Sequence, residues 1–455
     1  SAVSKDNTIV NEKIVENATC TFCGCCCDDI TLTVDMDKKV VTKAKDACVL
    51  GKSWFLNHVI EDKPIARIAG KEVPLDDAID EAAKILIEAK FPILYGMSDT
   101  ICEAQRQCAP IMDDCLGTID TTTSVCHGPS GMAFQGVGEP SMTLGEVKNR
   151  ADFVMYWGGN PAEAHPRHFA RYAVTPEGMF TPNGKDDRTV VICDVRHTKT
   201  AGVADIFLQV KPGKDFELLW MLRAACKGVE IPDNCKEICG IDKETVTDLF
   251  EKMKNCTYGV IFFGMGLTMS RGRHFNSGAL MALATDLNEF THFVAKPARG
   301  HGNVTGADNV VAWQTGYPFG VNFSRGHPRF NPGEFTTVDT LTRGEADAAL
   351  IIASDPVANF PKPAIDHITS DKCKLISIDT KNTPTSEAAH VSIQTSTYGI
   401  NTGGTVYRMD DVPISLRPAF DSPFPSDLEV LTKLRKKVNK LAKKLNRPYA
   451  TKKYI

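Results

Sequence analysis

Four cysteines near the start of the chain have the residue type and spacing to bind iron. Cys20 and Cys23 are separated by two residues, Cys27 follows, and Cys48 comes after a short polar hairpin. Thiolates at this spacing predict one [4Fe-4S] cluster held by these four residues. A zinc site is the alternative, but its second Cys-x-x-Cys pair is absent. A disulfide framework would require an oxidising compartment, which the sequence does not indicate.

A second candidate centre lies in the polar loop Thr121–Ser130, where Cys126 is followed by His127. A thiolate is a soft metal ligand, and an imidazole can handle a proton near neutral pH. A small buried Cys beside an ordinary loop His is the structural alternative. The pair predicts a metal centre only if other motifs agree.

A third candidate is the glycine-rich loop Arg299–Gly306. The planar fork of an Arg side chain can bind a small carboxylate with two parallel hydrogen bonds. A plain surface turn is the alternative interpretation of this loop.

An internal repeat indicates how these loops are positioned. Phe153–Pro161 recurs 195 residues later as Ala348–Pro356, and Val190–Asp194 recurs 185 residues later as Leu375–Asp379. Each copy reads as strand, polar turn and helix, then a second strand that ends in an acid beside Thr residues. An α/β sheet binds nucleotides at such strand ends. Two Rossmann-like halves kept only for packing are the alternative, because neither half contains G-x-G-x-x-G.

The intervening sequence predicts a parallel α/β protein. Short strands are expected at Ile30–Val34 and Lys39–Thr42, and a helix at Leu75–Ala89, where apolar residues recur at the helical period. Phe91–Gly96 and Val260–Phe263 read as buried strands. The Gly264-Met265-Gly266 turn after the latter suits a close approach of backbone to phosphate.

Composition limits the class of protein. The 455 residues exceed one core and predict several domains, with 42% hydrophobic residues, 24% charged residues and a net charge of -4. No apolar run approaches the roughly 20 residues of a membrane helix. Sixteen cysteines without a secretion signal predict a reducing, anaerobic cytoplasm.

The C-terminal segment Leu431–Ile455 carries ten Lys and Arg residues and no acid. Leu434, Val438, Leu441 and Leu445 predict a helix with one apolar stripe over 431–446. That helix either folds onto its own domain or docks on a partner. Docking on another subunit or on an acidic ferredoxin-like carrier is the interpretation favoured here.

Together these motifs resemble the molybdopterin-dependent oxidoreductases over nearly the whole chain. The cluster cysteines, the Cys126-His127 loop, Trp157-Gly158-Gly159-Asn160, Asp194, Gly264-Met265-Gly266 and the Arg299 loop occur in the order that this family shows. The chain is similar to formate dehydrogenases, and more closely to the formylmethanofuran dehydrogenases of methanogenic archaea.

The resemblance implies cofactors and site residues. Cys126 corresponds to the protein ligand of molybdenum or tungsten, with His127 and Arg299 beside the open metal site. Two molybdopterin guanine dinucleotides are expected to contact the following positions: Gly158, Gly159, Asn160, Asp194, Thr198, Gly213, Asp215, Gly264, Met265, Gly266, Ser354, Asp355, Asp379 and Thr383. Cys25 and Cys26 are then not cluster ligands.

Two departures from the family pattern stand out. Relatives place a Lys two residues after the fourth cluster Cys, where this chain has Leu50 and then Lys52, so a relay role for Lys52 is not supported. The C-terminal β-barrel domain that closes over the pterins is missing from this chain. A separate barrel subunit, an amidohydrolase subunit and ferredoxin-like carriers are the expected partners, with no nucleic acid and no membrane span.

The expected architecture is α/β, with an iron-sulfur domain at 1–62 rejoined by about 400–455. One Rossmann-like pterin domain covers 123–301, and the other covers 63–122 with 302–399. The expected reaction is reduction of CO2 to formate, which passes to another subunit for condensation with methanofuran. A formate dehydrogenase, another molybdopterin oxidoreductase such as a nitrate reductase, and a pterin-free electron-wiring scaffold are the alternatives.

Overall fold

The structure, a computed structural model, describes residues 11–447. This part of the chain begins with a small antiparallel sheet. Its elements are β1 (Glu12–Ala18), β2 (Ile30–Asp35) and β3 (Val40–Lys45), followed by α1 (Val49–Leu56). The predicted hairpin is confirmed. Strand β1, which the sequence pattern did not predict, adds a third strand before the cysteine loop.

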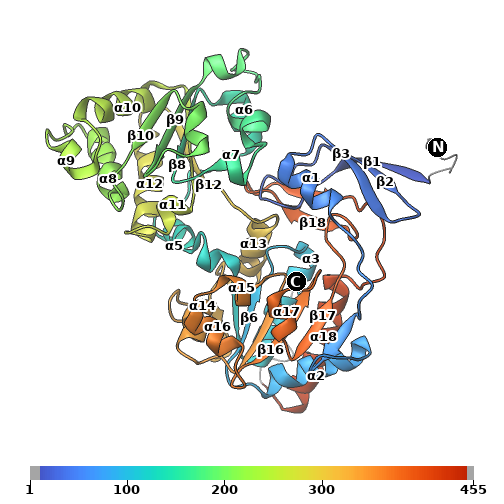
Figure 1. The fold of residues 1–455 in the computed structure, drawn as a ribbon. Helices are drawn as coiled ribbons and strands as arrows, with labels where there is room; N and C mark the ends of the chain where they lie inside the picture. Colours follow the sequence, from blue (N-terminus) through green and yellow to red (C-terminus); the bar gives the residue numbers. More distant parts are fainter. Residues whose placement is uncertain (1–10, 448–455) are drawn as a thin grey trace. The chain divides into compact units, whose positions relative to one another are not determined.

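The described chain divides into two compact units, shown with their elements in Figure 1. Among the described residues, unit 1 comprises 11–125, 301–408 and 413–447, and unit 2 comprises 126–300 and 409–412. Unit 2 is therefore an insertion into unit 1, joined by a short return segment at 409–412.

Unit 1 contains a nine-stranded sheet of order β14-β13-β7-β6-β15-β16-β17-β4-β5. The strands are β4 (Ala66–Ile68), β5 (Lys71–Glu72), β6 (Pro92–Gly96), β7 (Thr118–Thr121), β13 (Val321–Asn322), β14 (Arg329–Phe330), β15 (Ala348–Ile352), β16 (Lys374–Asp379) and β17 (Val391–Gln394). Strands β18 (Gly404–Tyr407) and β19 (Pro413–Leu416) form a separate hairpin. The predicted strand at Phe91–Gly96 is confirmed as β6.

Helices cover both faces of this sheet because its central strands bury side chains on both sides. They are α2 (Leu75–Glu88), α3 (Cys102–Gln105), α4 (Cys108–Cys115), α13 (Val304–Thr315), α14 (Thr337–Thr342), α15 (Pro356–Asn359), α16 (Lys362–Ile368), α17 (Pro384–Ala388) and α18 (Asp427–Lys444). Leu94 packs in one core with α2, α4 and α18, whereas Ile93 and Tyr95 pack in another with α14 and α16. Such two-sided burial is typical of parallel strands.

Unit 2 has a five-stranded parallel sheet of order β10-β9-β8-β11-β12. Its strands are β8 (Phe153–Trp157), β9 (Thr189–Asp194), β10 (Ile206–Gln209), β11 (Tyr258–Phe263) and β12 (His292–Pro297). Its helices are α5 (Gly128–Val137), α6 (Leu144–Arg150), α7 (Pro161–Ala164), α8 (Asp215–Cys226), α9 (Cys235–Cys239), α10 (Lys243–Asn255), α11 (Met265–Thr268) and α12 (His274–Leu287).

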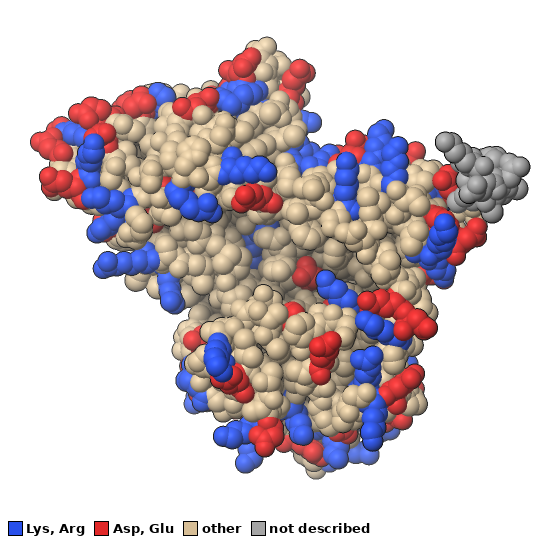
Figure 2. All heavy atoms as spheres, in the orientation of Figure 1, with Lys and Arg blue, Asp and Glu red and all other residues tan. Residues whose placement is uncertain are grey.

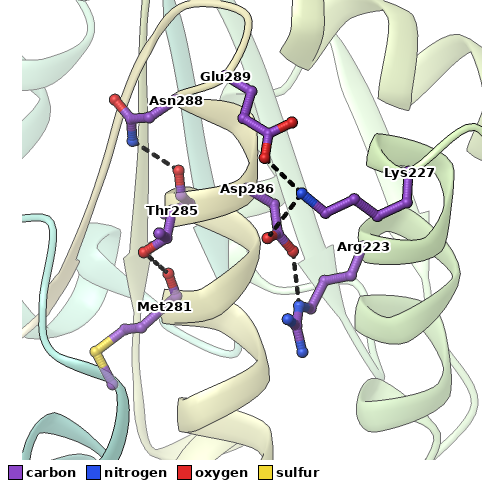
Figure 3. A network of polar contacts seen from close by, with 8 residues as sticks. Arg223, Lys227, Met281, Thr285, Asp286, Asn288 and Glu289 are labelled. Atoms are coloured by element: carbon purple, nitrogen blue, oxygen red, sulfur yellow. Dashed lines mark hydrogen bonds and ion pairs between the residues drawn. The ribbon is translucent and has the colours of Figure 1, made fainter.

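Helices α8 and α12 of unit 2 are joined by an ion-pair network on their outer faces (Figure 3). Arg223 donates to Asp286 at 2.8 Å, and Lys227 lies 2.5 Å from Glu289 and 3.7 Å from Asp286. Exposed pairs of this kind contribute little energy each. The apolar residues beneath them, Leu219, Leu222, Leu280 and Leu283, are fully buried and hold the two helices together.

The two units repeat one strand arrangement. The order β17-β16-β15-β6-β7 in unit 1 matches β10-β9-β8-β11-β12 in unit 2, and all ten strands run parallel within their sheets. The segments that repeat in sequence form the equivalent strands β8 and β15, and β9 and β16. The sequence repeat is therefore a structural repeat.

The basic C-terminal helix is α18, which begins at Asp427, four residues before the predicted start. Val430, Leu431, Leu434 and Val438 are buried in the core with α2 and α4. Lys433 and Lys437 pair with Asp76 and Asp80 of α2 at 3.2 and 2.7 Å. On the side of unit 1 that carries α2, Figure 2 shows cationic and anionic side chains intermingled. The favoured docking interpretation of this helix was wrong for its apolar stripe, which packs on its own unit.

Two further observations complete the fold. Lys452 and Lys453 of the basic segment lie outside the described residues. Over residues 11–447, no helix has both the length and the apolar character that crossing a membrane requires.

Candidate functional site

The four predicted cluster cysteines lie close together in unit 1. The loop between β1 and β2 closes on itself, since the Cys20 N–H donates to the Cys27 carbonyl at 2.8 Å. Cys48 caps α1, and its Sγ accepts the Gly51 N–H at 3.4 Å. Burial raises the pKa of Cys20, and the nearby thiols of Cys23, Cys27 and Cys48 raise it further. Neighbouring thiolates repel one another because all are negative. They can therefore form together only beside a cationic partner.

Cys26 lies beside these four cysteines but makes a core contact of its own. Cys26 is fully buried in the main core of unit 1, and its S–H donates to the Gly302 carbonyl at 2.8 Å. Its backbone has a φ of 39°, a left-handed conformation that is uncommon for residues other than glycine. Cys25 is also buried, and a side-chain hydrogen bond with Cys23 raises its pKa. Cys26 thus has a packing role.

The cysteine loop is attached to the segment that follows Arg299 in sequence. Cys23 forms an isolated antiparallel bridge with His301. A Cβ added to Gly302 would stand 1.9 Å from the Thr21 carbonyl oxygen, so only glycine permits this contact. Gly302 therefore serves the packing of this loop on the cysteine loop.

Within residues 11–447, no three His, Cys, Asp or Glu side chains converge closely enough to hold a single metal ion. A [4Fe-4S] cluster makes a different demand, because each of its four irons binds one thiolate and the thiols must surround a larger object. The grouping around Cys20 fits such a cluster better than it fits zinc. Lys52 is exposed on α1, with its N–H donating to the Cys48 carbonyl.

Identical hydrogen bonds hold the polar turns after β8 and β15. Asn160 Oδ1 accepts from Thr200 N–H at 3.3 Å and from Thr200 Oγ1 at 2.6 Å. Asp355 Oδ1 accepts from Thr385 N–H at 3.1 Å and from Thr385 Oγ1 at 2.6 Å. Asn160 and Asp355 also share φ near -125°. Both predicted ligands thus shape the strand-end turns.

The predicted glycines of unit 2 pack against each other. Gly158 has a φ of 58°, and an added Cβ would stand 2.4 Å from Leu267 N, while Gly264 and Gly266 would each clash with the Gly158 carbonyl. The equivalent of Gly158 in unit 1 is Ala353, whose φ is also positive at 48°. Close contact between two strand-end loops accounts for these glycines, and the adjacent Met265 is 48% exposed.

The strand-end acids also occupy equivalent positions. Asp194 Oδ1 accepts Val195 N–H and Asp379 Oδ1 accepts Thr380 N–H, both at 2.7 Å. Burial raises the pKa of Asp379 to about 7. A small cavity opens beside it, and its lining includes Arg67, Lys381 and Gln394. These side chains offer donors and acceptors suited to a base edge or a phosphate.

Other predicted contacts in unit 2 leave buried polar atoms without partners. Asp215 Oδ1 accepts the indole N–H of the fully buried Trp157 at 2.8 Å, whereas Oδ2 is buried and bonds to no other residue. Thr198 Oγ1 is likewise buried without a partner. Both oxygens could hydrogen-bond a bound polar group. In unit 1, Ser354 is half-buried and Thr383 caps α17.

Cys126 and His127 lie at the start of α5 in unit 2. Cys126 is half-buried, and its carbonyl accepts from Thr268 Oγ1 at 3.1 Å. His127 is buried and lies 3.2 Å from Ser130 Oγ through Nδ1. Burial lowers the pKa of His127 to about 3, and the charge of Arg299 acts in the same direction. The ring is therefore neutral at physiological pH.

Arg299 comes from the end of β12 and is 7% exposed. Its electrostatic effect on His127 shows that the two predicted residues are neighbours within unit 2. The preceding Ala298 N–H donates to the Phe263 carbonyl at 2.9 Å, and the Phe263 ring packs edge-on against His127. One residue of β11 thus contacts both loops.

Sequence reasoning missed three buried polar side chains near Arg299. His165 Nε2 lies 2.7 Å from the Arg299 carbonyl oxygen, and His168 Nδ1 lies 2.7 Å from Tyr156 Oη. Lys296, buried on β12, pairs with Asp411 at 2.8 Å and with Glu139 at 3.4 Å. A comparison of the two halves of the repeat could have found His165, because the equivalent position in the other half is Phe360.

No protein-family model matches the chain, whereas individual proteins of known name do. The chain is 44% identical to the B subunit of tungsten-containing formylmethanofuran dehydrogenase 2 of Methanocaldococcus jannaschii, over 438 residues that cover 94% of this chain and 99% of the relative. Formate dehydrogenase H of Escherichia coli is 23% identical over 337 residues, with 63% of this chain and 46% of that protein covered.

Acetylene hydratase from Pelobacter acetylenicus superposes with a TM-score of 0.71 at 13% identity, covering 96% of this chain and 71% of that one. This likeness shows that the chain shares the mixed α/β fold of that protein. Identity over nearly the full length decides the nearer relationship: the chain belongs to the family of B subunits of formylmethanofuran dehydrogenase.

Proposed function

We propose that this chain is the catalytic subunit of its complex and reduces CO2 to formate. Its centre would be tungsten or molybdenum held by two molybdopterin guanine dinucleotides, with electrons arriving through a [4Fe-4S] cluster. The observation that carries the proposal is the neighbourhood of His127 and Arg299 beside Cys126 at the strand ends of unit 2. The close relative named as tungsten-containing supports the choice of cofactor.

Residues of both units fit the dinucleotides. Each unit ends two neighbouring strands in a polar turn and an acid, which is where open α/β sheets bind nucleotides. In unit 2 the buried oxygens of Thr198 and Asp215 that have no hydrogen-bond partner could bond to a dinucleotide. In unit 1 the cavity beside Asp379 supplies a carboxyl and two cations, Arg67 and Lys381. We infer one dinucleotide in each unit.

Cys126, Arg299 and His127 would each have a different role in the reaction. Cys126 would hold the metal as a thiolate, and the metal-pterin group would supply the two-electron redox step when bound. Arg299 binds the carboxylate of formate with its planar fork, and His127 hydrogen-bonds or handles the proton. The overall reaction balances as CO2, two electrons and one proton giving formate.

Electrons enter through the cysteine loop of unit 1. Cys20, Cys23, Cys27 and Cys48 would each bind one iron, which removes the mutual repulsion that keeps their thiols protonated. We assign no electron-relay role to Lys52, which lies four residues after Cys48, whereas relatives place their Lys two residues after the equivalent Cys.

Assembly follows from the family of the complex. Formate would pass to an amidohydrolase subunit for condensation with methanofuran, while a small barrel subunit closes over the pterins and ferredoxin-like carriers deliver electrons. The name of the relative supports membership in a multisubunit dehydrogenase.

Analysis of the complex, purified without oxygen, tests the proposal. We expect one atom of tungsten or molybdenum per chain and more iron than one cluster requires. Acid hydrolysis of the pterins should release two GMP per chain. Incubation with ¹³CO2 and a low-potential reductant should give ¹³C-formate. Iron without tungsten or molybdenum would leave only an electron-wiring scaffold, and a loaded metal without formate turnover would assign another reaction.

A further inference from the structure

His165 makes a buried contact that the proposed chemistry does not use. It is 4% exposed, follows α7 in unit 2, and places Nε2 2.7 Å from the carbonyl oxygen of Arg299. A carbonyl oxygen can only accept a hydrogen bond, so Nε2 must carry the hydrogen. The imidazole is thereby fixed in one orientation, with its donor aimed at the backbone of Arg299.

The internal repeat shows that the fold does not require a donor here. His165 lies five residues after Asn160, and Phe360 lies five residues after the equivalent Asp355. The backbone N–H of each residue donates to the carbonyl of the proline that begins the preceding helix, at 2.8 and 2.9 Å. Phe360 is 9% exposed and packs edge-on against Tyr95. A buried ring is what packing needs at this position, and the nitrogen of His165 is additional.

The Arg299 carbonyl that His165 holds lies between Ala298 and Gly300. Ala298 is fixed by its hydrogen bond to the Phe263 carbonyl. Gly300, on the other side of Arg299, has no Cβ, and an added one would meet nothing within 4 Å. The peptide between Arg299 and Gly300 could therefore rotate, since glycine restricts it little. The bond from His165 fixes that peptide and, with it, the backbone from which the Arg299 side chain departs.

We propose that His165 is a positioning residue for Arg299. Its Nε2–H holds the Arg299 carbonyl, so that the guanidinium remains beside His127 in a fixed direction for a small carboxylate. The choice of formate as that carboxylate rests on the proposed function, whereas the effect on the backbone does not. Misplacement of a binding group by about 1 Å can cost roughly 100-fold in rate.

Three variants of His165 in the intact complex test this. His165→Phe inserts the residue that the other half uses, so the fold is retained and only the donor is lost. His165→Gln keeps an amide N–H near the position of Nε2, and His165→Asn keeps polarity with a shorter reach. His367→Phe is the matched control, because His367 Nε2 makes the same kind of bond, 2.6 Å from the Ala346 carbonyl, in unit 1.

Two readouts apply to each variant: hydrogen-deuterium exchange of the peptide 296–303, and the KM and kcat for formate. We expect faster exchange and at least a tenfold rise in KM for His165→Phe and His165→Asn, with metal and iron content unchanged. His165→Gln should recover most of both losses, and His367→Phe should change neither. Rescue by Gln is what a purely space-filling role could not produce.

Wild-type exchange and wild-type KM in His165→Phe would overturn the proposal, as would equal losses in His165→Phe and His165→Gln. If His165→Phe fails to retain its metal, the comparison of His165→Asn with His165→Gln decides. A wild-type complex that neither oxidises nor binds formate would refute the proposed function instead. In that case faster exchange in His165→Phe would still support the link from His165 to Arg299.

Discussion

The ring of Phe263 lies edge-on to the imidazole of His127, with 5.9 Å between their centroids. Because the Phe263 carbonyl also accepts the Ala298 N–H, the loops that carry His127 and Arg299 are both fixed to the end of β11. The two loops leave different strands, so substitutions can test their contributions separately.

Cys126→Ala should abolish CO2 reduction and formate oxidation while the iron-sulfur spectrum persists. Loss of a direct metal ligand removes several kcal/mol of transition-state stabilisation, a decrease of about 100-fold or more. Steady-state assays and electron paramagnetic resonance measure the two effects. Cys256→Ala, at the half-buried end of α10, is the control and should remain active. Activity above a few per cent of wild type in Cys126→Ala would show that Cys126 is not a ligand.

Arg299→Lys should weaken formate binding and slow turnover although the charge is kept. A point charge replaces a planar fork, and one of two parallel hydrogen bonds is lost, which corresponds to about 1 to 2 kcal/mol or roughly tenfold in KM. Steady-state kinetics with formate measure the change. Arg150→Lys, whose guanidinium packs over Phe180 at the surface, should behave as wild type. Unaltered constants for Arg299→Lys would reduce Arg299 to a loop residue.

Cys20→Ala and Cys26→Ala should have opposite effects on iron. Cys20→Ala should lose the cluster, whereas Cys26→Ala should keep it and destabilise the chain by about 1 kcal/mol, because a buried carbonyl loses its donor. Iron analysis and thermal denaturation distinguish the two outcomes. Iron loss in Cys26→Ala with retention in Cys20→Ala would reverse the assignment of ligands.

Asp379 should make the stability of the cofactor-free chain fall as pH rises. Its pKa is 3.8 in the unfolded state and about 7 when folded, so the folded state binds more protons between these values. Stability is greatest below about pH 4 for this group and declines up to about pH 7, by a few kcal/mol in total. Urea denaturation across pH 5 to 8 should show a steeper fall of stability in wild type than in Asp379→Asn, because other buried acids such as Asp120 still titrate in both. Cofactor that donates hydrogen bonds to Asp379 should reduce the slope, and parallel curves for both proteins would contradict the prediction.

Leu434→Ala should destabilise the chain by about 2 to 5 kcal/mol, because the side chain is fully buried where α18 meets α2 and α4. Lys436→Ala, on the exposed side of the same helix, should change stability by less than about 0.5 kcal/mol. Chemical denaturation measures both. Truncation after Val430 removes the same buried residues, so it should destabilise unit 1 itself and not only its assembly with other subunits. Equal stabilities of Leu434→Ala and Lys436→Ala would contradict this packing.

Local sequence patterns predicted much of the fold because they act through near neighbours. The helical period of Leu75–Ala89 and the buried strand at Phe91–Gly96 appear in the structure within one residue. The repeat of Asn160 and Asp355 predicted equivalent turns, and the matching bonds to Thr200 and Thr385 confirm them.

Contacts between distant segments could not be predicted from those patterns. The bond from His165 to Arg299 joins residues 134 apart, and the contact of Gly302 with Thr21 depends on how two loops meet. The same limit explains the C-terminal helix, whose periodicity revealed an apolar stripe but not the surface that buries it. The roles assigned to Cys126, Arg299 and the cluster cysteines remain predictions for the experiments above.

The insertion of unit 2 into unit 1 sets the order in which the protein can fold during synthesis. All five strands of unit 2 lie between residues 153 and 297, so this unit can fold as soon as that stretch has emerged. Strand β6 emerges earlier and can pair with β7, but its other partner, β15, begins only at Ala348, and their core closes only with α18. The apolar edge of β6 that later pairs with β15 thus stays unpaired through more than half of translation. Nascent chains of this protein are therefore expected to need chaperone protection over that interval.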